Sequence, residues 1–106
     1  MLLIYQDVQS LQSEARRLCS RISVHDANLA SQLRRAAQAV ALNTGEGMGA
    51  RAGARRQAYS VALRETRECM AAIDVAERWG YAERDEAMVD RLDKIAATLY
   101  RLTATR

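Results

Sequence analysis

The sequence predicts an all-α protein whose four helices form an antiparallel, up-down-up-down bundle. The 106-residue chain contains no proline, which would interrupt helices, and it is rich in the good helix formers Ala, Leu, Arg, Glu and Gln. Its apolar residues recur at alternating steps of three and four, which is the spacing of one helical face. Because a chain of this length supports one hydrophobic core, we expect a single domain over residues 1–106.

The first two helices are predicted on either side of a short polar turn. The first covers about residues 3–23 and the second about 28–46, and either Asp26 or Asn28 can cap the second. An apolar heptad stripe marks the face that the first helix buries, and it consists of Ile4, Val8, Leu11, Ala15, Leu18 and Ile22.

Glycines separate the second predicted helix from the third. Four of the five glycines lie within residues 45–53, and we interpret this segment as a helix C-cap and a turn. The third helix is predicted over about residues 52–79, where Gly80 stops it, and the fourth over about 83–103. The fourth helix repeats the apolar stripe with Met88, Leu92, Ile95, Leu99 and Leu102.

The second predicted helix is apolar beyond a single stripe. Between Ala36 and Leu42 every residue except Gln38 is apolar, and a helix that is apolar on all sides is buried on all sides. We therefore expect Ala39 and Leu42 to contact another subunit of a homo-oligomer, although exposed alanine is also simply a good helix former. The aromatic residues that flank Gly80 are expected at the cap of the core or at an edge of the subunit contact, and they are Trp79 and Tyr81.

Arginine supplies nearly all of the positive charge, and it is concentrated near the start of the third helix. The formal net charge is +3, and residues 51–70 contain five arginines against two glutamates. Such a cluster is typical of a surface that contacts the phosphates of RNA or DNA. Only Tyr59 could stack on a base nearby, so sequence-specific recognition of single strands is not expected. The candidate nucleic-acid-binding residues are Arg34, Arg35, Arg51, Arg55 and Arg56.

No arrangement of residues indicates catalysis, a cofactor or a metal ion. The only histidine, His25, lies in the predicted turn with no third group to orient it, and one histidine outside the helices cannot build a bundle metal site. Cys19 and Cys69 are expected to be small buried apolar residues rather than a disulfide. Glu46 is expected to form a structural ion pair, because it lies at the C-terminal end of the second predicted helix, where the helix dipole disfavours a free carboxylate.

Hydropathy indicates a cytoplasmic protein without membrane contact. No segment approaches the roughly 18 consecutive apolar residues that a membrane span needs. The apolar opening, residues 1–5, is too short to be a signal peptide.

Ordered segments of the chain resemble a known family of four-helix-bundle proteins. These segments are Gln32–Ala37, Asn43–Gly49, the aromatic Tyr59, the Glu-rich run 62–68 and the pair Gly80-Tyr81. In this order and spacing they resemble the proteins encoded in intervening sequences of bacterial 23S rRNA genes. The accessory proteins of diversity-generating retroelements belong to the same family.

The resemblance implies an antiparallel four-helix bundle that assembles into a homo-oligomer, which in this family is a pentamer. It also implies that some members bind nucleic acid, and that the retroelement members work beside a reverse transcriptase. It implies no enzymatic activity.

Three functions therefore compete. The first is a non-enzymatic homo-oligomeric module that binds RNA or DNA through a basic surface, accessory to a reverse transcriptase or another larger protein. The second is a structural or protein-binding oligomer whose arginines form salt bridges between subunits. The charged residues can also be explained as ordinary solvated i,i+4 pairs on a helix surface, such as Asp74 with Arg78. The third, ranked last because the predicted stripes of the first and fourth helices are apolar, is a small helical enzyme acting on an anionic substrate.

Overall fold

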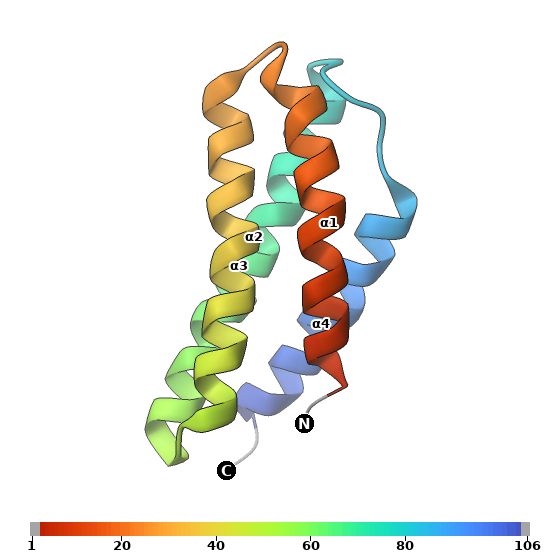
Figure 1. The fold of residues 1–106 in the computed structure, drawn as a ribbon. Coiled ribbons are helices and arrows are strands. Elements are labelled where there is room, and N and C mark those ends of the chain that lie inside the picture. Colours follow the sequence, from red (N-terminus) through yellow and green to blue (C-terminus); the bar gives the residue numbers. More distant parts are fainter. Residues whose placement is uncertain (1–2, 105–106) are drawn as a thin grey trace.

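The computed structural model describes residues 3–104, and this part of the chain forms four helices and no strand. Their bounds are α1 Ile4–Ser23, α2 Ala27–Gly49, α3 Ala52–Arg78 and α4 Glu86–Ala104. The first two residues of the apolar opening segment lie outside the described residues. The helices pack side by side into a body of 42 × 22 × 19 Å, and the all-α prediction is confirmed (Figure 1).

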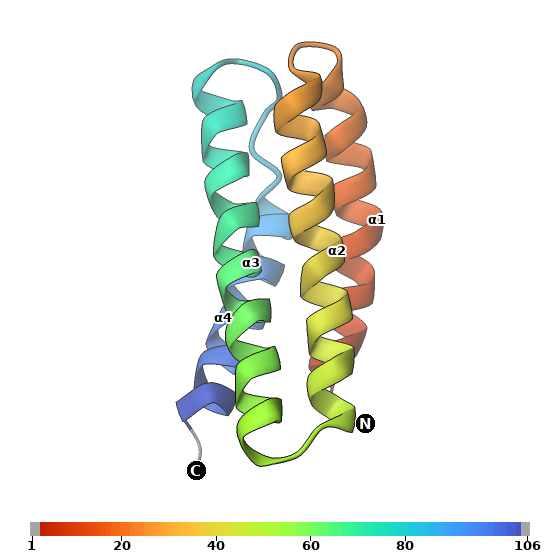
Figure 2. The ribbon, with the colours of Figure 1, turned by 90° about the vertical axis from the view of Figure 1, so that its left-hand side faces the viewer.

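The helices are packed in a closed order. α1 packs against α2, α2 against α3, α3 against α4, and α4 against α1. Figure 2 shows α2 with α1 on one side and α3 on the other. Connections 24–26 and 79–85 lie together at one end of the molecule, which we call the α1–α2 end (Figure 1). Connection 50–51 and both described ends of the chain lie at the opposite end.

Two aspartates set where α2 and α4 begin. Oδ1 of Asp26, one of the two residues predicted to cap α2, accepts a hydrogen bond from the backbone N–H of Leu29 at 2.9 Å. Oδ1 of Asp85 accepts one from the backbone N–H of Met88 at 3.1 Å. Because Asp85 takes the capping position, α4 begins one residue after it and not at the predicted residue 83.

The end of α3 is fixed by a Schellman motif at Gly80. This glycine has φ +74°, in the left-handed region that a residue with a Cβ rarely adopts. Its N–H donates to the carbonyl of Glu77 at 3.0 Å, and the N–H of Tyr81 donates to the carbonyl of Ala76 at 2.8 Å. The prediction that Gly80 stops the helix is confirmed.

α2 continues through the glycines where the sequence predicted a turn. It extends to Gly49, and only residues 50–51 connect it to α3. Gly47 is buried against the ring of Tyr59, and a Cβ added there would lie 2.7 Å from the ring's Cδ1 atom. Gly47 therefore serves close packing of α2 on α3 and does not end the helix.

The predicted apolar stripes form the core. All six stripe residues of α1 are buried, and so are the first four of α4, while Leu102 is half-buried. Two threonines lie fully buried among them. Oγ1 of Thr66 donates to the carbonyl of Ala62 at 2.8 Å, whereas Oγ1 of Thr44 has no hydrogen-bond partner within residues 3–104.

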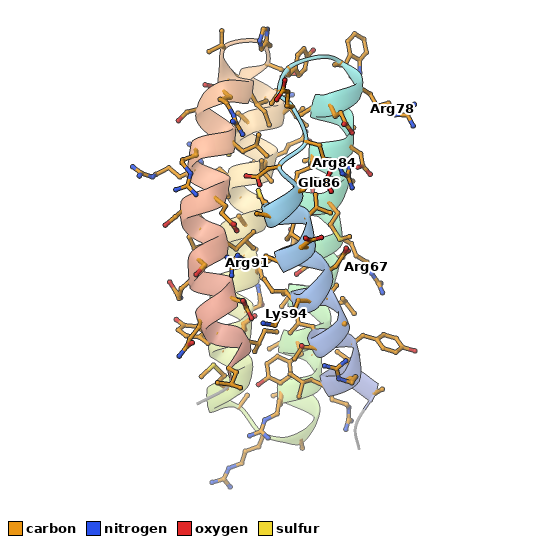
Figure 3. All side chains as sticks on the ribbon, turned by 90° about the vertical axis from the view of Figure 1, so that its right-hand side faces the viewer. Arg67, Arg78, Arg84, Glu86, Arg91 and Lys94 are labelled. Atoms are coloured by element: carbon orange, nitrogen blue, oxygen red, sulfur yellow. The ribbon has the colours of Figure 1, made fainter. Side chains whose placement is uncertain are left out.

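Charged side chains outside the apolar stripes also join α1 and α4. Arg91 donates hydrogen bonds to Oε1 of Glu14 at 2.8 Å and to Oδ1 of Asp7 at 2.9 Å. Nζ of Lys94 lies 3.2 Å from Oδ2 of Asp7. Figure 3 shows Arg91 and Lys94 reaching from α4 toward α1. We call these four residues the α1–α4 network.

Glu14 makes this network important for stability. The residue is only 8% exposed, and Arg91 is the one cation within hydrogen-bond distance of its carboxylate in the described chain. A carboxylate that has lost most of its water depends on such a partner to remain charged at low cost.

Replacing Arg91 with methionine should therefore lower the free energy of unfolding by about 1–3 kcal/mol, because Glu14 would keep a buried charge without its partner. Urea unfolding followed by circular dichroism measures this loss. Lys94→Met removes an exposed partner of Asp7 and should cost less than about 1 kcal/mol. Equal losses in the two variants would contradict the special role of Arg91.

Gly47→Ala should lower the free energy of unfolding by about 1–3 kcal/mol, because the added methyl group overlaps the Tyr59 ring. Gly49→Ala is the matched control on the same helix, since a Cβ there meets nothing within 4 Å. The control should be neutral or stabilising by up to about 1 kcal/mol. Thermal melts of both variants test this, and a Gly47→Ala protein as stable as the control would show that the Tyr59 ring moves aside without cost.

Candidate nucleic-acid interface

One concentration of positive charge without acidic partners lies on α1 and the first half of α2. Residues 15–45 contain five arginines and a single acidic residue, Asp26, whose carboxylate caps α2. The acids of α1, Asp7 and Glu14, pair with α4 instead. The five arginines are all exposed, and within residues 3–104 none of them forms an ion pair: Arg16, Arg17, Arg21, Arg34 and Arg35.

A groove with a cavity volume of about 660 Å³ runs between α1 and α2 on this side of the molecule. We call it the α1–α2 groove. The hollow arises because both helices present small side chains to it, which cannot fill the space between two helical surfaces. Its small lining residues are Ala15, Cys19, Ser20 and Ser23 from α1, and Ala27, Ala30, Ser31 and Ala37 from α2.

One arginine from each helix lines the groove. These are Arg16 of α1 and Arg34 of α2, and Nη2 of Arg34 donates to Oγ of Ser31 at 3.4 Å. Two guanidinium groups with hydroxyl donors beside them suit the oxygens of a phosphate group. A shallower depression with a volume of about 420 Å³ continues the basic surface along α1 and is lined by Arg16, Arg17, Ser20 and Arg21.

Side-chain hydrogen bonds join the two walls of the groove. Nε2 of Gln12 donates to the carbonyl of Ala37 at 2.9 Å, and Sγ of Cys19 donates to the carbonyl of Ala30 at 3.3 Å. Because both bonds link α1 to α2, the spacing of the two helices along the groove is fixed.

The five arginines predicted to bind nucleic acid do not form one cluster. Arg34 lines the α1–α2 groove, whereas Arg35 is exposed one position further round α2. Arg51, Arg55 and Arg56 are exposed at the opposite end of the molecule, where Nε of Arg55 donates to the carbonyl of Ala50 at 2.9 Å. A role for these arginines in binding stays a prediction.

Arg16, Arg17 and Arg21 were not among the predicted binding residues. On α1 the apolar stripe is the stronger pattern, and the prediction placed the basic cluster within residues 51–70. The signal that identifies the better surface is the near absence of acids over residues 15–45, combined with the pairing of the two α1 acids to α4.

The candidate oligomer residues lie on two separate surfaces. Leu42 is 73% exposed on the outer face of α2, with Ala39 half-buried one turn earlier. Trp79 is 71% exposed at the α1–α2 end, and Tyr81 beside it is half-buried against the core. Large exposed apolar side chains of this kind fit the predicted subunit contacts, which stay a prediction.

Two predicted ion pairs differ in the structure. Glu46 is exposed and forms no ion pair within the described residues, because α2 continues past it and directs it to solvent. Asp74 does not pair with Arg78 but with Arg84 of connection 79–85, at 2.7 Å. Arg84 also lies 3.1 Å from Glu86 and 3.6 Å from Glu77, so it ties the connection to both flanking helices (Figure 3).

Both cysteines are free thiols. Cys69 is fully buried, as predicted, and burial raises its pKa to about 12, with the nearby carboxylate of Glu65 adding to the rise. Cys19 is half-buried in the α1–α2 groove. Burial also raises the pKa of Cys19, while the positive charge of Arg34 acts in the opposite direction.

Two further kinds of site are absent from residues 3–104. No group of three or more His, Cys, Asp or Glu side chains there is placed to hold a metal ion. No helix in the same range combines the length and the apolar character of a membrane span.

These features define a small helical-bundle protein with a basic groove on one side and ion-paired helices on the other. The chain belongs to the 23S rRNA-intervening sequence protein family, whose model matches residues 1–102. This confirms the resemblance seen in the sequence. A comparison with curated protein sequences gave no match.

A solved structure has the same fold. It is the crystal structure of a protein of unknown function from the S23 ribosomal protein family of Bacteroides thetaiotaomicron. The two chains are 16% identical, the TM-score is 0.87, and the match covers 97% of this chain and 100% of the other. At this identity the likeness concerns the fold alone.

Alkylation at pH 8 should distinguish the two thiols, because only thiolates react and a raised pKa keeps a thiol protonated. N-ethylmaleimide should modify Cys19 slowly in the folded protein and leave Cys69 unmodified until urea unfolds the chain. The reaction of Cys19 should accelerate as the pH rises. Mass spectrometry of the Cys19→Ala and Cys69→Ala variants assigns the labels, and labelling of Cys69 at the rate of Cys19 would contradict the described burial.

Proposed function

We propose that this chain is a non-enzymatic, nucleic-acid-binding subunit of a homo-oligomer, built as an antiparallel up-down-up-down bundle. The observation that supports the proposal most directly is the α1–α2 groove, with Arg16 on one wall and Arg34 on the other. In this proposal the oligomer is a pentamer and works beside a larger RNA-handling enzyme such as a reverse transcriptase, as the sequence resemblance implies.

The groove suits the phosphate backbone rather than the bases. Its lining consists of arginine, glutamine, serine, alanine and cysteine, with no aromatic ring among the described lining residues. Guanidinium groups bind phosphate oxygens with little dependence on sequence, whereas base recognition needs contacts with base edges or faces. Binding through the groove should therefore be sequence-tolerant and strongly dependent on salt.

Oligomerisation would strengthen this weak contact. Leu42, Ala39 and Arg35 recur at steps of three and four, so they share one outer face of α2. A second copy that covers Leu42 would remove a largely exposed apolar side chain from water. Each added subunit would present another groove to the same nucleic acid, and linked weak sites bind more tightly than one.

The test is binding of mixed-sequence RNA and DNA, measured by fluorescence anisotropy at 50 and 200 mM salt. The logarithm of the affinity should fall with the logarithm of salt by about 0.7–0.9 per phosphate contacted. The double variant Arg16→Gln/Arg34→Gln should reduce the slope by about 1.4–1.8 and weaken binding at both salt concentrations. Arg55→Gln/Arg56→Gln, which removes the same charge at the opposite end, is the matched control and should lose less.

The outcomes separate the surfaces. Equal losses in the two double variants would show that overall charge, and not the groove, governs binding. A larger loss in Arg55→Gln/Arg56→Gln would move the site to the start of α3. Bound RNA should also protect Cys19 from alkylation, since its thiol lines the groove. Absence of binding at 50 mM salt would contradict the proposed function.

A second candidate function is a purely structural oligomer. It is favoured by two exposed acids on α4, Asp90 and Asp93, which could pair with the α1–α2 arginines of a second copy. In that case Arg16→Gln/Arg34→Gln should dissociate the oligomer, and the wild-type protein should not bind RNA. Light scattering measures the mass of each variant and decides between the two functions.

A further inference from the structure

Three aromatic rings are stacked on the surface at the α1–α2 end of the molecule. The rings of His25 and Tyr81 are nearly parallel, with 6° between their planes and 5.3 Å between their centroids. The rings of Tyr81 and Trp79 are 6.2 Å apart and inclined by 27°. His25 comes from connection 24–26, and the other two residues come from connection 79–85. We call these three residues the aromatic platform.

The platform is held in place from both sides. The Asp26 cap fixes the chain directly after His25. The Schellman motif at Gly80 fixes the backbone between the two other rings, and the ion pairs of Arg84 tie the rest of that connection to α3 and α4. Rings that are positioned before a ligand arrives lose little conformational freedom when it binds.

The platform nevertheless leaves much of its surface open. Trp79 is 71% exposed and His25 is exposed, while Tyr81 is packed against the core. A tryptophan is the largest apolar side chain, and exposing most of it to water is unfavourable unless a partner covers it. The structure therefore presents a flat aromatic surface suited to another flat ring.

The surrounding charge indicates the chemistry of that partner. Arg21 in the last turn of α1 and Arg78, the last residue of α3, lie at the same end of the molecule. Within residues 3–104 neither forms an ion pair, and Figure 3 shows Arg78 directed away from the bundle. Glu83 is an exposed acid of this end that forms no ion pair within residues 3–104, whereas Glu77 faces Arg84 and Asp26 caps α2.

We propose that the aromatic platform binds an unpaired nucleobase of single-stranded nucleic acid, with Trp79 stacked on the base. This rests on the proposed nucleic-acid-binding function and names the part of the ligand that is recognised. A nucleotide combines a flat ring with a negative charge, which matches an exposed aromatic ring at the end of the molecule that also carries Arg21 and Arg78. A base within a duplex is covered on both faces by its neighbours, so the platform selects single strands.

This arrangement assigns two different tasks to the two surfaces. The α1–α2 groove contacts phosphates and accepts duplex or single strands alike. The platform stacks on bases without reading their edges, so it favours single strands without favouring one sequence. The arginines along α1, from Arg16 to Arg21, connect the groove to the platform end.

Trp79 is the only tryptophan, so its fluorescence reports on the platform alone. A ten-nucleotide mixed-sequence RNA should quench this fluorescence, and the same RNA in a blunt duplex should quench it less. Trp79→Ala should weaken binding of the single strand, measured by anisotropy, by about 5- to 100-fold and change duplex binding little. Trp79→Phe should restore much of the affinity. Tyr100→Ala removes a ring that is 60% exposed on α4, away from the platform, and should have no effect.

Each other outcome has a separate meaning. If single-strand binding depends on Arg16 and Arg34 but not on Trp79, the platform is not a base-binding site and the proposed function stands. If Trp79→Ala weakens single-strand and duplex binding equally, or changes the mass measured by light scattering, Trp79 acts in the fold or in a subunit contact. Circular dichroism of Trp79→Ala separates these two. If no nucleic acid binds at 50 mM salt, the proposed function itself fails.

Discussion

The ion pairs between α1 and α4 determine which charged side chains of this molecule remain unpaired on its surface. Asp7 and Glu14 are the acids of α1, and both are committed to Arg91 and Lys94 across the junction. The other side of α1 is consequently left with arginines alone. Because α2 contributes arginines and hardly any acid along its first half, the two helices together form a basic surface although the chain's net charge is only +3.

Small side chains give that surface its shape. Alanine and serine on the facing sides of α1 and α2 leave a groove, whereas large stripe residues fill the core on the inner sides of the same helices. The groove needs small residues and the core needs large ones at adjacent positions of the same helix, as Cys19 and Leu18 of α1 show. A small residue also creates space where α2 packs against α3. Gly47 has no side chain, and the ring of Tyr59 occupies the space that a Cβ would fill.

Local signals in the sequence predicted much of the fold, and long-range contacts explain what they missed. The apolar stripes, the Asp26 cap and the Gly80 stop act within one or two helical turns, so the pattern alone identifies them. The packing of Gly47 on Tyr59 and the burial of Glu14 depend on residues of other helices. The candidate site was predicted only in part. Arg34 was predicted, but it forms a site only together with Arg16, which the packing of α1 on α2 brings to the same groove.

The α1–α4 network also bears on how the molecule assembles during synthesis. Its hydrogen bonds join residues 77 and 84 positions apart, whereas each of the other helix pairs consists of neighbours along the chain. Joining residues this far apart costs more loop-closure entropy than joining neighbouring helices, which makes this step the slower one. On the ribosome, α1 to α3 can therefore pack while Glu14 is still hydrated, and its burial must await the emergence of α4.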